Sequence, residues 1–112
     1  MKYKDGVFIQ VIKVIGGKTT KIVPSDRIIS AMEIADALSK KISGQEIVVT
    51  SMLDGVHSKN SLHYGGNAFD LRVWIYNQDQ INDMVVNLKS NLGKDYDTVF
   101  EGDHIHVEYD PK

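Results

Sequence analysis

The chain has 112 residues, a formal net charge of −2, 42% hydrophobic residues and 25% charged residues, which is typical of one soluble globular domain covering residues 1–112. The charge lacks the basic excess typical of nucleic-acid-binding proteins, so no nucleic-acid partner is expected. Because cysteine is absent, disulfides and thiolate zinc sites are excluded, and only histidine and carboxylate side chains remain as metal ligands.

No apolar run approaches the roughly 20 residues needed to cross a bilayer, so the sequence predicts no membrane partner. The first apolar run, Val7–Ile15, contains Gln10 and Lys13 and has no small-residue cleavage site. We therefore do not interpret it as a signal peptide, and we expect synthesis in the cytoplasm. The single domain is expected to be a monomer.

The first half of the chain predicts a β-hairpin, a helix and a short strand. Val7–Ile15 and Lys18–Val23 are rich in β-branched residues and are separated by two glycines, which favours a hairpin. A helix follows Ser25, a good N-cap residue, and ends at Gly44. Its apolar stripe recurs at helical spacing and comprises Ile28, Met32, Ala35, Leu38 and Ile42. Glu46–Met52 is predicted to be a strand.

The second half predicts a long loop, a strand, a helix and a final hairpin. These elements are the loop Leu53–Gly66, the strand Asn67–Tyr76, the helix Gln78–Leu92 and the strands Tyr96–Phe100 and His104–Tyr109. Trp74 is expected in the core or at the sheet edge, with a groove lining as the alternative. The predicted class is α+β, a small antiparallel sheet with two helices packed on one side.

Alternation along Asn67–Tyr76 separates a core face from a polar face. The core face comprises Phe69, Leu71 and Val73, and the other face comprises Ala68, Asp70 and Arg72. In the last strand His104 and His106 likewise share a face, opposite its apolar residues. If the two strands are neighbours, the aspartate and the imidazoles lie on the same side of the sheet.

Candidate metal ligands lie in two short stretches, Ser61–Asp70 and Asp103–His106, which hold three of the four histidines. A catalytic zinc site has about three protein ligands and keeps one position open for water, whose pKa falls to about 7. His63, Asp70 and one of the two C-terminal histidines would supply the three ligands. A nearby carboxylate, Asp103 or Glu101, could then act as general base.

The full pattern resembles a known family. Ser61-x-His63-x-x-Gly66-x-Ala68-x-Asp70 is followed by Asp103-x-x-His106. This arrangement resembles the zinc D-Ala-D-Ala carboxypeptidases and L-alanyl-D-glutamate endopeptidases, a group that also includes the hedgehog signalling domain. The resemblance covers Val48 to Tyr109, about half of the chain, and implies the hedgehog/D-Ala-D-Ala peptidase-like fold.

The resemblance also implies roles for individual residues. His63, Asp70 and His106 would bind Zn²⁺, Asp103 would be the catalytic base, and His104 would steady the substrate carbonyl or the transition state. The alternative register, with Glu101-x-x-His104 in place of Asp103-x-x-His106, has the same spacing. His106 is preferred because the family's ligand is followed by an apolar and then an acidic residue, as His106 is here.

The implied function is zinc-dependent hydrolysis of peptidoglycan stem peptides by an endolysin-like or compact cell-wall hydrolase. Such an enzyme, of phage or bacterial origin, would act on the cell wall after release from the cytoplasm. The alternative is a non-catalytic binding module of the same fold that keeps its zinc, or a domain in which the metal is only structural.

The chain departs from the family at the substrate-binding arginine. Many members carry Ser-Gly-Tyr-Arg before the first motif, where residues 51–54 here are Ser-Met-Leu-Asp. His57, Lys59 or Arg72 could bind a substrate carboxylate instead. Arg72 could also simply pair with Asp70 or Glu108. Ser61 is either a site residue or a residue that orders its loop.

Overall fold

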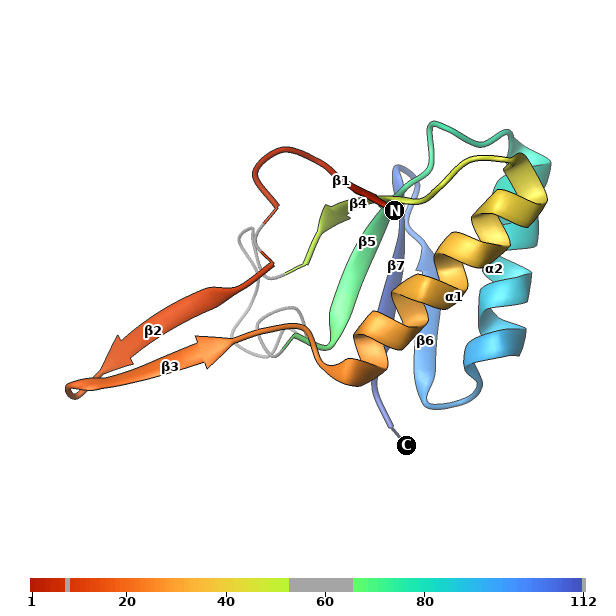
Figure 1. Cartoon of the computed structure of the whole chain (residues 1–112). Coiled ribbons are helices and arrows are strands. Elements are labelled where there is room, and N and C mark those ends of the chain that lie inside the picture. Colours follow the sequence, from red (N-terminus) through yellow and green to blue (C-terminus); the bar gives the residue numbers. More distant parts are fainter. Residues whose placement is uncertain (8, 53–65, 112) are drawn as a thin grey trace.

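The computed structural model describes residues 1–7, 9–52 and 66–111 (Figure 1). It has an α+β architecture with a five-stranded sheet in the order β1-β4-β5-β7-β6 and a separate two-stranded hairpin, β2-β3. The elements are β1 Lys2–Tyr3, β2 Val11–Ile15, β3 Lys18–Ile22, α1 Asp26–Ser43, β4 Val48–Ser51, β5 Ala68–Arg72, α2 Gln78–Leu92, β6 Tyr96–Phe100 and β7 His104–Tyr109. No helix in these three ranges is both long and apolar enough to cross a membrane.

The two helices begin and end at sequence signals. The Ser25 side chain accepts a hydrogen bond from the Ile28 N–H and caps α1, which ends at Gly44 in the left-handed conformation. The α2 N-terminus has a capping box, in which Asn77 and Gln80 each bond the other's backbone N–H. The predicted helices are confirmed, and both pack on one side of the five-stranded sheet (Figure 1).

The core lies between this sheet face and the helices. Its fully buried members include Phe69 and Leu71 of β5 and Ile105 and Val107 of β7. They occupy alternate positions, which confirms the predicted core face. The side chains of Asp70, Arg72, His104 and His106 therefore lie on the opposite face, which the helices leave uncovered (Figure 1).

Several expectations about the sheet need correction. The sheet is mixed, because β1 runs parallel to β4, and the two-residue strand β1 was not predicted. The predicted hairpin forms, but it stays outside the main sheet and projects from the body of the protein (Figure 1). Ala68 is buried although it shares the polar face of β5.

The strand predicted for Asn67–Tyr76 is shorter than expected. β5 ends at Arg72, and the chain then turns, with the Tyr76 N–H bonded to the Val73 carbonyl at 2.9 Å. Tyr76 is buried, but Trp74 is 76% exposed, so its expected place in the core is wrong. The turn breaks the alternation that would have continued along a strand.

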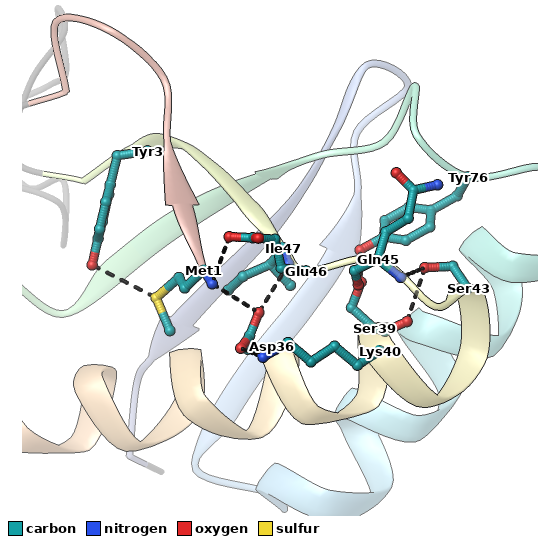
Figure 2. A network of polar contacts seen from close by, with 10 residues as sticks. All are labelled: Met1, Tyr3, Asp36, Ser39, Lys40, Ser43, Gln45, Glu46, Ile47 and Tyr76. Atoms are coloured by element: carbon teal, nitrogen blue, oxygen red, sulfur yellow. Dashed lines mark hydrogen bonds and ion pairs between the residues drawn. The ribbon is translucent and has the colours of Figure 1, made fainter.

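A polar network joins α1 to the first strands of the sheet (Figure 2). The Asp36 carboxylate accepts a hydrogen bond from the Ile47 N–H at 3.0 Å and pairs with Lys40 at 3.0 Å. The Met1 ammonium group lies 3.4 Å from Asp36 and 2.8 Å from Glu46. The network holds the start of β4, and through it β1, against the helix.

The environment of Asp36 predicts that the stability of the folded protein depends on pH. Burial raises the pKa of its carboxyl, but the hydrogen bonds from Lys40 and the Ile47 N–H, together with the charges of the Met1 ammonium and Lys40, hold the pKa below the usual 3.8. A lowered pKa in the folded state stabilises the protein above pH 3.8, and this stabilisation is lost as the pH falls through the folded value. Asp36→Asn should therefore lower Tm at pH 7, and the difference from the wild type should shrink in acid.

Thermal unfolding followed by circular dichroism between pH 7 and pH 2 measures this difference. Asp83→Asn, which changes an exposed carboxylate of α2, is the control. Its Tm, plotted against pH, should run parallel to that of the wild type. A constant deficit of Asp36→Asn at every pH would contradict the prediction.

Candidate metal centre and adjoining groove

The candidate site lies on the face of the sheet opposite the helices, where β5 and β7 run antiparallel. In this register Asp70 stands opposite His106, and Arg72 stands opposite His104. The metal hypothesis requires these two strands to be neighbours, and the structure confirms that they are. Two residues 36 positions apart in the chain are thereby brought into contact.

Asp70 and His106 form a partly buried pair. Asp70 Oδ1 and His106 Nδ1 are 2.7 Å apart, and the other imidazole nitrogen, Nε2, lies 3.5 Å from Glu108 Oε2. The hydrogen bond to Asp70 raises the pKa of His106 above its ordinary value, against burial, which lowers it. Carboxylates thus flank both nitrogens of His106.

This pair fits a zinc site. Ligand atoms at zinc distances of about 2.0–2.1 Å in a tetrahedron lie about 3.3 Å apart, so Asp70 Oδ1 and His106 Nδ1 need to separate by only about 0.6 Å to admit the ion. Histidines that bind metals through one nitrogen usually donate the other N–H to a carboxylate, as Glu108 is placed to accept here. The donor types, histidine and carboxylate, also suit zinc.

His104 lies beside this pair and faces three carboxylates. Its Nδ1 bonds Asp103 Oδ1 at 2.5 Å, and its Nε2 lies 3.9 Å from both Asp70 Oδ2 and Glu101 Oε2. Of these two histidines, His106 forms the hydrogen bond with Asp70, which favours the Asp103/His106 register over the Glu101/His104 alternative. Asp103 itself is 89% exposed, with His104 holding one of its oxygens.

Gly66 lies two residues before β5, at a close approach of two backbone segments. Its backbone is in the left-handed region at φ +75°, and a Cβ there would lie 2.4 Å from the Val23 carbonyl oxygen. The Gly66 carbonyl accepts from the Ser25 N–H at 2.9 Å. The glycine therefore leaves room for the backbone between β3 and α1.

A groove of about 350 Å³ adjoins the pair. Its lining residues are Lys4, Thr50, Asp70, Arg72, Trp74, Asp103 and His104. The Arg72 guanidinium lies 4.2 Å above the centre of the Trp74 ring. No ion pair joins Arg72 to Asp70, Glu108 or any other carboxylate in the described part of the chain, so the expected simple pairing of Arg72 is not found.

The other candidate residues, His57, Lys59, Ser61 and His63, lie outside the described residues. Within residues 1–7, 9–52 and 66–111, the group of three possible metal ligands that converges within 4.8 Å is Asp97, Glu108 and Asp110. Exposed acidic groups of this kind are common without an ion. The zinc hypothesis therefore depends on Asp70 and His106, with His63 as the predicted third ligand.

The chain was compared with protein-family models and with curated proteins, and neither comparison found a match. The family resemblance consequently rests on the two sequence motifs. The structure adds the contact between Asp70 of the first motif and His106 of the second.

Proposed function

We propose that this protein is a zinc-dependent peptidase that hydrolyses peptidoglycan stem peptides. The observation that carries the proposal is the Asp70–His106 pair, with Glu108 behind it and an open groove beside it. The motifs supply the third ligand, His63, and the expected substrate class. Bound zinc would polarise the scissile carbonyl and activate a water molecule.

The residues around the pair have distinct roles in this proposal. Asp103 takes the proton from the attacking water and passes it to the leaving amine, because its exposed carboxylate lines the same groove as Asp70. His104 holds Asp103 through Nδ1 and turns Nε2 toward Asp70. His104 lines the same groove, where it can contact the substrate carbonyl or the transition state.

Digestion of purified peptidoglycan tests the proposal. The zinc-loaded protein should release new amino termini, and Asp103→Ala should lower the rate roughly 10²–10⁴-fold, the usual effect of removing a general base. Its zinc content should not change, because Asp103 is not one of the ligands. Asp83→Ala removes an exposed carboxylate on α2, outside the groove, and should keep full activity.

The exposure of Asp103 favours a second candidate, a zinc-containing binding module without catalysis, because a site open to water does not shield the reacting groups from solvent. In that case the zinc-loaded protein would bind peptidoglycan and release no amino termini. Asp103→Ala would then leave the bound fraction in a pull-down with insoluble peptidoglycan unchanged.

A further inference from the structure

The β2–β3 hairpin, residues 11–22, forms an arm that projects from the body of the protein (Figure 1). Among the described strands, its two strands pair only with each other. Two-stranded hairpins are marginally stable in water by themselves, and each strand of the arm has one edge with unpaired backbone groups. A further strand along the arm would therefore stabilise it.

One face of the arm combines apolar side chains with a lysine. Ile12 stands opposite Lys21, and Val14 stands opposite Thr19, so these four side chains share a face. Ile12 is 59% exposed and Val14 is 69% exposed, so the described residues leave this apolar surface open to solvent. Residues 6–25 contain three lysines and no acidic residue, although the chain as a whole is acidic. The arm thus fits a surface that is both apolar and negatively charged.

The open edge of the five-stranded sheet at β6 has this composition. β6 is the last strand of the sheet, and its residues 96–99 line a hollow of about 530 Å³. Asp97 stands opposite Glu108, and carboxylate oxygens of Asp97, Glu108 and Asp110 converge within 4.8 Å. Val99 shares the face of Asp97 and is 48% exposed. Negative charge, an apolar side chain and the unpaired backbone of an edge strand are therefore found together.

The opposite edge of the sheet, at β1, suits the arm less well. β1 has two residues and β6 has five, so β1 offers fewer backbone groups. Lys2, Lys4 and Arg72 line the hollow beside β1 together with two acidic residues. Lys89 and Lys94 line the hollow beside β6, but they come from the end of α2 and the turn after it, on the helix side of the sheet. The lysines of the arm therefore favour the carboxylate side of β6.

We propose that the chain associates with a second copy of itself, and that the arm of one copy adds to the β6 edge of the other by main-chain hydrogen bonds. The arm then continues the sheet, which places Lys21 near Asp97, and Ile12 and Val14 near Val99. Two copies that exchange both arms form a closed dimer, whereas one-way contacts extend into a chain of copies. The contact uses neither the candidate metal ligands nor the groove beside Asp70, so it is independent of the proposed function.

Sedimentation equilibrium of the full chain tests the association. The wild type should be a monomer of 12.6 kDa near 1 μM and reach twice that mass or more toward about 1 mM. Lys21→Glu and Asp97→Lys each place like charges in contact and should weaken the association roughly tenfold or more. An equimolar mixture of the two variants should associate as the wild type does, because every arm then meets an opposite charge on its partner.

Lys41→Glu is the matched control, because it reverses an exposed lysine of α1 outside the arm. It should associate as the wild type does. Hydrogen exchange followed by mass spectrometry locates the contact: residues 11–22 and 96–100 should become protected as the protein concentration rises.

A wild type that stays monomeric toward about 1 mM would overturn the proposal. Protection confined to other segments would also overturn it, and so would a mixture that fails to associate although both variants keep the wild-type circular dichroism spectrum. If the monomer instead binds vesicles of phosphatidylglycerol, and Lys21→Glu abolishes this binding, the arm belongs to an anionic lipid surface and not to a second copy.

Discussion

Asp70→Ala and His106→Ala should each purify without zinc, whereas the wild type should hold about one zinc per chain after reconstitution. Each variant removes one of about three protein ligands. The remaining two ligands cannot hold the ion against dialysis, since structural and catalytic zinc sites need at least three. Metal content per chain, measured by inductively coupled plasma mass spectrometry after dialysis, gives the result directly. His63→Ala should behave in the same way.

His104→Ala is the matched control for this experiment. His104 lies on the same face of β7 as His106, two residues away, but its Nε2 is 3.9 Å from Asp70 Oδ2, whereas His106 Nδ1 is 2.7 Å from Asp70 Oδ1. This variant should keep its zinc. Loss of zinc in His104→Ala together with its retention in His106→Ala would instead assign the metal to the Glu101/His104 register. Absence of zinc from the reconstituted wild type would remove the metal centre altogether.

Gly66→Ala should destabilise the fold far more than Gly44→Ala. Both glycines have nearly the same left-handed backbone, at φ +75° and φ +76°, so both variants lose about 1–2 kcal/mol of unfolding free energy from backbone strain. A Cβ at Gly44 meets nothing within 4 Å, but at Gly66 it meets the Val23 carbonyl oxygen at 2.4 Å. That oxygen belongs to the backbone and cannot rotate away, which adds about 1–3 kcal/mol of overpacking.

Urea unfolding at neutral pH measures the two losses. The pair of variants separates backbone strain from steric crowding of the added Cβ, because φ is nearly the same at both glycines and only the atoms near the Cβ differ. Equal losses would show that the close approach of Val23 contributes nothing. Because Gly66 lies four residues before Asp70, Gly66→Ala should also weaken zinc binding, and Gly44→Ala, at the far end of α1, should not.

The local elements could be predicted because their signals are local. The α2 bounds follow from an apolar stripe at helical spacing and a glycine after it, and the last two strands follow from alternation. The two-residue strand β1 has no such signal, since its pairing with β4 depends on residues more than 40 positions away. The exposed Trp74 was missed for a related reason: a turn after Arg72 replaces the strand that the apolar residues suggested.

For the candidate site, the sequence by itself determined which side chains could bind a metal ion. The spacing of histidine and carboxylate side chains in the two motifs is a property of the chain, and so is the shared face of His104 and His106, since strand alternation is local. The motif already favoured His106, but the tertiary structure alone decided that His106 stands opposite Asp70. Register between two strands is set by packing of their core faces, here Leu71 against Ile105 and Phe69 against Val107.

The groove likewise exists only in the folded protein. Lys4, Arg72 and Asp103 come from three separate parts of the chain, and no local pattern joins them. Lys4 lies beside the groove because its N–H donates a hydrogen bond to the Val49 carbonyl. The turn after β5 places the Trp74 ring against the Arg72 guanidinium. The sequence thus identified the side chains that could bind a metal ion, whereas the groove beside Asp70 depends on long-range backbone pairing.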